Sequence, residues 1–73
     1  MEDKIILIME KIFGQKVNNE ITQKSCENWD SIRHLNLIIA LELEFNENFE
    51  PEEISEMLSF GKIFEVITGR KNG

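Results

Sequence analysis

Apolar residues recur at helical spacing in several separate stretches of the chain, with polar residues between them. The first stretch predicts a helix over residues 3–13, and Gly14 follows it as a C-cap glycine does. The longest stretch predicts a helix over residues 31–45. Pro51 suits the first turn of a short helix over 51–57, because that turn does not use its backbone N–H. A last helix is expected over 60–68, with Ser59 as its cap and Gly69 as its end.

The segment 14–30 is polar and has no helical period. A loop of this length in a compact domain is usually functional or disordered. Its few apolar residues are expected to hold it against the helices: Val17, Ile21, Cys26 and Trp29. No alternating run is followed by a hairpin turn, so no strand pair is predicted. We expect a single all-α domain over residues 1–73, a small antiparallel helical bundle of three main helices plus one short helix.

The predicted helix over 31–45 carries two apolar stripes instead of one. The first stripe is made of Leu37, Ile38, Leu41 and Phe45. The second is made of Ile32, Leu35, Ile39 and Leu43. Two positions along a helix are separated by about 200°, so the stripes face different directions. A bundle of this size cannot readily cover both, and we expect one to be exposed as a partner surface. The alternative is a central helix that is buried on all sides.

Acidic residues dominate the charge of the chain, with 14 Asp and Glu against 8 Lys and Arg and a net charge of -6. This balance argues against binding to nucleic acid or to anionic membranes, and it suits a basic protein partner. No Lys or Arg occurs between Arg33 and Lys62. The acids in that interval form either a solvated face or a surface that steers partners: Glu42, Glu44, Glu47, Glu50, Glu52, Glu53 and Glu56.

Compartment and assembly follow from what the sequence does not contain. A single cysteine, Cys26, permits no internal disulfide and no cysteine-based metal cluster. No apolar run approaches the length of a membrane span, and no signal peptide is evident after the Met-Glu-Asp start. We therefore expect a cytoplasmic monomer without membrane insertion.

The candidate chemistry lies where Asp30 and Ser31 open the longest helix, directly after Trp29. A helix N-terminus stabilises anions, so a hydroxyl there is well placed to carry a phosphate-bearing group. The simpler interpretation is that Ser31 or Asp30 only caps the helix. A hydrolase that pairs Ser31 with His34 is a further alternative, although no orienting acid or oxyanion hole is evident. The glutamates lack the spacing of a calcium loop, so no metal site is predicted.

Taken together, these segments resemble the acyl carrier protein family. The resemblance runs from about Ile5 to Ile67 and preserves the order of the elements. The matching stretches are Trp29-Asp30-Ser31-Ile32, Leu35 to Phe45 with its Ala-Leu-Glu-X-Glu-Phe ending, Phe49-Glu50-Pro51-Glu52-Glu53-Ile54, and Met57 to Ile63.

The resemblance implies that Ser31 carries 4'-phosphopantetheine, derived from coenzyme A, through a phosphodiester. Asp30 would then be its neighbour in recognition by a phosphopantetheinyl transferase. The terminal thiol of the arm would hold an acyl group as a thioester and present it to acyl-loading and acyl-accepting enzymes, so the chain itself is not an enzyme. Leu37, Leu41 and Phe45 would shelter the acyl chain. The implied partner surface comprises Ile32, Arg33, Leu35, Ile39, Glu42 and Glu47.

Some residues depart from the pattern of housekeeping fatty-acid carriers. Arg33 and Asn36 stand where those carriers usually have acids, and Trp29 is not their usual residue. Ile32 replaces the common leucine after the serine. The resemblance thus favours a dedicated carrier in a specialised pathway, for a polyketide, peptide or sugar-linked acyl group. The alternative is a small acidic helical protein-interaction module without a prosthetic group.

Overall fold

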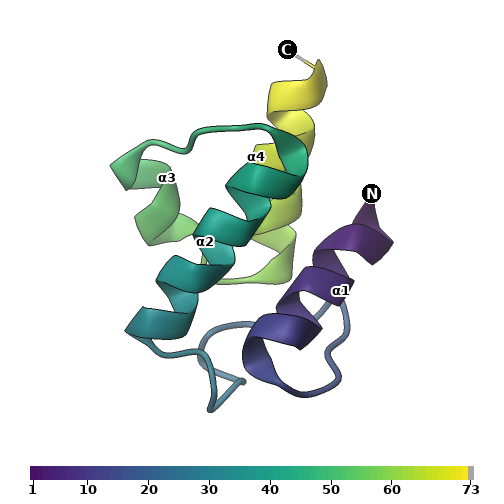
Figure 1. Ribbon diagram of the computed structural model, residues 1–73, viewed down its shortest axis with the longest axis vertical. Helices are drawn as coiled ribbons and strands as arrows, with labels where there is room; N and C mark the ends of the chain where they lie inside the picture. The colour runs from purple at the N-terminus through teal and green to yellow at the C-terminus, as the bar shows by residue number, and fades with distance from the viewer. Residues whose placement is uncertain (73) are drawn as a thin grey trace.

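Four helices form the protein in a computed structural model that describes the backbone of residues 1–72 and the side chains of residues 1–69. They are α1 (Glu2–Phe13), α2 (Ser31–Phe45), α3 (Pro51–Glu56) and α4 (Phe60–Asn72). α1 runs down the view of Figure 1, whereas α2 and α4 run up it. The all-α prediction is therefore confirmed, and the antiparallel arrangement applies to α1 against both α2 and α4.

The ends of the helices follow the glycine signals only in part. Gly14 adopts a left-handed conformation with φ 68°, and its N–H donates to the carbonyl of Glu10 at 2.8 Å, which ends α1. Gly69 does not adopt that conformation and lies inside α4, so the prediction that it ends the last helix is wrong. Ser59 does cap α4, because its hydroxyl accepts from the amide of Lys62 at 3.1 Å.

The core lies between α1, α2 and α4 and also takes in side chains from the loop and from the residues beside α3. Its buried members are Ile5, Met9, Phe13, Ile21, Cys26, Trp29, Leu37, Ile38, Leu41, Phe45, Phe49, Met57, Phe60, Ile63 and Ile67. Leu58, which follows the short helix, is an exposed apolar residue. Within residues 1–72, no helix combines the length and the apolar character that crossing a membrane requires.

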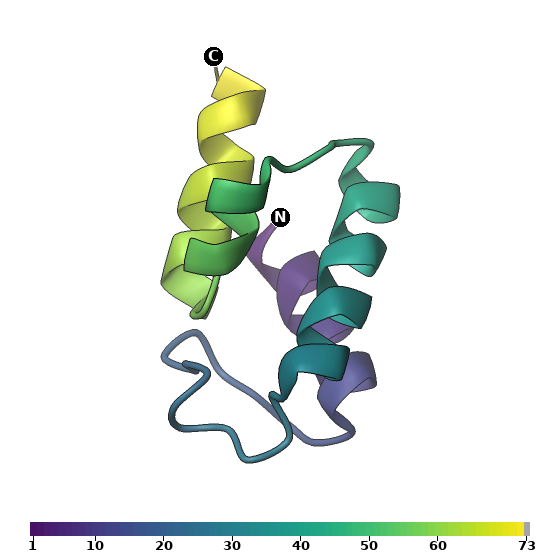
Figure 2. The same cartoon turned by 90° about the vertical axis from the view of Figure 1, so that its left-hand side faces the viewer.

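The loop between α1 and α2 is ordered and closes the lower end of the molecule, as Figure 2 shows. Three of its apolar side chains are buried, which confirms that such contacts hold it. Backbone hydrogen bonds add to them: Gln23 donates to the carbonyl of Leu58 at 2.8 Å, and Phe60 donates to that of Ile21 at 3.0 Å. The loop is thus fastened to the start of α4, and its last residues lead into α2 from a fixed position.

Candidate functional site

Ser31 is the first residue of α2, and Asp30 is its N-cap. Asp30 is extended, and its Oδ1 accepts a hydrogen bond from the amide of Arg33 at 2.8 Å. Of the two residues considered as caps, Asp30 is therefore the one that serves. Ser31 is exposed, and its hydroxyl makes no hydrogen bond with any residue that the structure describes. The hydroxyl is free to react or to carry a group without loss of the cap.

Arg33 holds both oxygens of the Asp30 carboxylate. Besides its amide, its Nη1 donates to Asp30 Oδ2 at 2.8 Å. The amide hydrogen bond, assisted by the charge of the guanidinium, lowers the pKa of Asp30 below its ordinary value. Asp30 consequently stays ionised and is engaged with Arg33, which leaves it poorly placed to accept a proton from Ser31.

His34 is engaged on both ring nitrogens, so the pair with Ser31 considered from the sequence is not formed. The indole Nε1 of Trp29 donates to His34 Nδ1 at 3.0 Å. An indole nitrogen can only donate, so Nδ1 is the acceptor and the neutral ring carries its proton on Nε2. That nitrogen lies 2.9 Å from the carbonyl oxygen of Ile54 and donates to it. His34 thereby joins the loop, α2 and α3.

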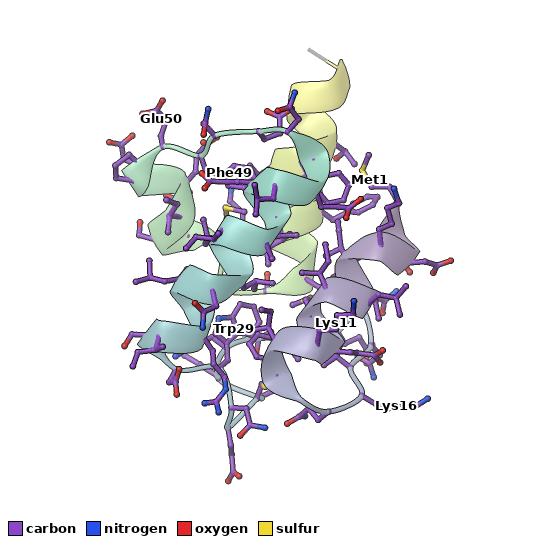
Figure 3. The ribbon with its side chains drawn as sticks, in the orientation of Figure 1. Met1, Lys11, Lys16, Trp29, Phe49 and Glu50 are labelled. Atoms are coloured by element: carbon purple, nitrogen blue, oxygen red, sulfur yellow. The ribbon has the colours of Figure 1, made fainter. Side chains whose placement is uncertain are left out.

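Trp29 is the buried anchor below this site. It lies between the lower ends of α1 and α2 in Figure 3 and is only 2% exposed. Its ring packs on Phe13 with centroids 4.9 Å apart, and its carbonyl accepts from the side chain of Gln23 at 3.2 Å. The hydrogen bond to His34 was not predicted from the sequence. A buried indole needs an acceptor for its N–H, and that need was the available signal for a nearby partner.

The two apolar stripes of α2 separate as predicted. Leu37 and Leu41 are fully buried and Phe45 nearly so. On the other side of the helix, Ile32 is 71% exposed, and Leu35, Ile39 and Leu43 are exposed as well. The alternative of a central helix buried on all sides is wrong. An uncovered row of large apolar side chains therefore begins one residue after the free hydroxyl.

Several of the acids after Arg33 have structural partners, so the acidic run is less free than its sequence indicates. Glu42 is half-buried, and its Oε2 accepts from the amide of Phe49 at 3.0 Å. Figure 3 labels Phe49 in the segment that leads from α2 to Glu50 and α3. Glu44 pairs with Lys4 at 3.2 Å, and Glu56 lies 3.7 Å from Lys62. In both pairs the lysine lies on a different helix from the glutamate. The sequence between Arg33 and Lys62 therefore does not reveal these ion pairs.

Comparison of the chain with protein-family models and with curated proteins gave no match. Within the described part of the chain, no group of three or more His, Cys, Asp or Glu side chains is placed to hold a metal ion. The start of α2, with the sequence motifs around it, is therefore the candidate site.

Proposed function

We propose that this protein is an acyl carrier that bears 4'-phosphopantetheine on Ser31. The observation that carries the proposal is the exposed Ser31 hydroxyl, free of hydrogen bonds to the described residues, at the first position of α2. The amides of Ser31 and Ile32 belong to the helix start, where N–H groups lack intrahelical acceptors and favour a phosphate. The motifs shared with acyl carrier proteins support the same attachment point.

Attachment would require the Ser31 oxygen to attack the coenzyme A phosphorus that bears the pantetheine. The new P–O bond forms as the bond to 3',5'-ADP breaks, and the hydroxyl proton passes to a base. Asp30 is engaged with Arg33, and both nitrogens of His34 are engaged, so the base belongs to the transferase. When bound, the arm supplies a terminal thiol that holds an acyl group as a thioester.

The exposed stripe of α2 gives this carrier a surface on which the transferase and acyl-handling enzymes can dock. Ile32, Leu35 and Ile39 are more than half exposed and follow Ser31 along the helix. Leu37, Leu41 and Phe45 are packed in the core, so sheltering an acyl chain among them requires these side chains to move apart. Arg33, paired to Asp30 beside the attachment point, gives the docking face a cation that suits a specialised partner.

Intact mass tests the proposal directly. The protein is incubated with coenzyme A and a phosphopantetheinyl transferase of broad specificity, and we expect a mass increase of one phosphopantetheine. Ser31→Ala should abolish the increase while keeping the fold, because Asp30 is the cap. Ser55→Ala, which removes another exposed hydroxyl, should be modified like the wild type. Labelling that persists in Ser31→Ala, or unlabelled wild-type protein, contradicts the assignment.

The exposed stripe by itself favours one other function, a small interaction module without a prosthetic group. In that case Ser31 remains unmodified under the same conditions, and Ile39→Ala still weakens binding to the module's partner. The mass measurement therefore distinguishes the two functions before any partner is known.

A further inference from the structure

A groove runs between α1 and α2 on the side of α2 that faces away from α3. It has a volume of about 360 Å³ and is lined by Ile8, Lys11, Ile12, Ala40, Leu43 and Glu44. A hollow of about 250 Å³ continues it along α1, with Lys4 and Leu7 added to the lining. Figure 3 labels Lys11 on α1, beside α2.

The floor and rims of this groove are largely apolar. Leu43 is 80% exposed on the α2 rim, and Leu7 is 58% exposed on the α1 rim. Leu43 also belongs to the exposed stripe of α2, so the groove continues that stripe toward α1. Single exposed apolar side chains are ordinary, whereas a contiguous set at the edge of a groove indicates a binding surface.

The charges along the groove differ from those of the rest of the chain. Lys4, Leu7 and Lys11 follow one another at helical spacing on α1, so both lysines border the same rim. Lys4 is paired with Glu44 across the groove, and Lys11 makes no ion pair with the described residues. Because Glu44 also lines the groove and is already paired with Lys4, Lys11 is the lining lysine whose charge is not balanced by a described acid.

We propose that the groove between α1 and α2 binds an amphipathic α-helix of a partner protein that carries carboxylates along the edge facing α1. Apolar side chains of the partner helix pack between Ile8, Ile12 and Leu43, as in other complexes of a helix in a groove. A carboxylate on its edge pairs with Lys11, which makes no ion pair with the described residues. A second copy of this chain is not the occupant, because each copy has a net charge of -6 and presents lysines at the same rim. The proposal holds whether or not Ser31 is modified.

Two designed helical peptides test it, with the same apolar face and opposite charges on the edge that meets α1. One carries glutamates there and the other carries lysines, and each is titrated into uniformly ¹⁵N-labelled protein. We expect the glutamate peptide to shift the amide signals of Leu7, Lys11 and Leu43 and to bind about tenfold more tightly than the lysine peptide.

Three variants test whether peptide binding depends on the groove or only on the overall charge of the protein. Lys11→Glu should reverse the preference between the two peptides, and Leu43→Gln should weaken both. Lys24→Glu makes the same charge change in the exposed loop and should leave both affinities unchanged. The proposal is overturned if neither peptide binds, if both bind equally, if the shifts fall on α3, or if the groove signals move on dilution of the protein alone, which would indicate a second copy.

Discussion

Trp29 and His34 form a hydrogen bond of 3.0 Å between indole Nε1 and imidazole Nδ1, and the rings are stacked with centroids 6.0 Å apart. Since the other ring nitrogen of His34 donates to the carbonyl of Ile54, one side chain fixes the start of α2 to both the loop and α3. Ser31 lies three residues before His34, in the first turn of α2, which this link and the Asp30 cap both hold.

His34→Ala should therefore destabilise the protein by about 1–3 kcal/mol, because it leaves the buried indole N–H of Trp29 without its acceptor. Trp29→Phe keeps an aromatic ring in the core, but it removes the donor and makes the buried side chain smaller. The loss of the hydrogen bond alone should lower the free energy of unfolding by about 0.5–1.5 kcal/mol, and the lost packing adds to this. Urea denaturation followed by circular dichroism measures both. If His34→Ala were as stable as the wild type, the bridge from the loop to α3 would have no energetic role.

Replacing one residue from each side of α2 tests the separation of the two apolar stripes. Phe45→Ala opens a cavity in the core and should cost about 3–5 kcal/mol, a large share of the stability of so small a domain. Ile39→Ala changes an exposed position and should alter stability by no more than about 0.5 kcal/mol. Ile39→Ala should instead slow modification of Ser31 by a transferase. Equal losses of stability in the two variants would contradict the orientation of α2 described here.

Sequence reasoning succeeded where the signal is local. The period of the apolar residues places all four helices, and the two stripes of α2 are assigned correctly to inside and outside because the angle between positions is fixed by helix geometry. The start of this helix at Ser31 likewise follows from a few consecutive residues.

The same reasoning failed where a contact joins distant parts of the chain. The hydrogen bond from His34 to Ile54 and the ion pair of Lys4 with Glu44 can be predicted only if it is known which helices meet. Gly69 illustrates a different limit, since a glycine near the end of an apolar period either ends a helix or continues it at a cost of about 1 kcal/mol. Packing against the rest of the molecule decides between these outcomes, and that packing cannot be predicted from the local sequence.

The Asp30 carboxylate should make the stability of the protein depend on pH in acid. In the folded state its pKa lies below the ordinary value of 3.8. The largest cause is the hydrogen bond that the carboxylate accepts from the Arg33 amide. Between the folded and the unfolded pKa of Asp30, the unfolded chain binds more protons than the folded one. The contribution of Asp30 to the free energy of unfolding is therefore complete above pH 3.8 and is lost as the pH falls through the folded pKa. Asp30→Asn still caps the helix but cannot titrate. Urea midpoints across this range should fall more steeply with acid for the wild type than for Asp30→Asn, and parallel curves would contradict a lowered pKa of Asp30 in the folded state.

Glu42 should contribute to folding through its bond to the backbone amide of Phe49, in addition to any contribution to partner binding. Glu42→Ala removes the acceptor from a partly buried amide and should cost about 1–3 kcal/mol. Glu42→Gln retains an acceptor oxygen without the charge and should recover part of that loss. Thermal unfolding of the two variants measures the difference. If both lost the same stability, the contribution of Glu42 would come from its charge alone.

Glu52 is the better residue for testing whether the remaining acids steer partners, because it is exposed and its carboxylate has no hydrogen bond or ion pair with the described residues. If steering operates, Glu52→Lys should lower the second-order rate of Ser31 modification by a basic transferase, mainly by slowing association. The effect should shrink as salt is added, since the Debye length is about 10 Å at about 0.1 M ionic strength. Glu20→Lys makes the same charge change in the loop and serves as the control. If neither salt nor Glu52→Lys changed the rate of modification, the acidic residues would be only a solvated face. Recognition would then depend on the apolar side chains of Ile32, Leu35 and Ile39.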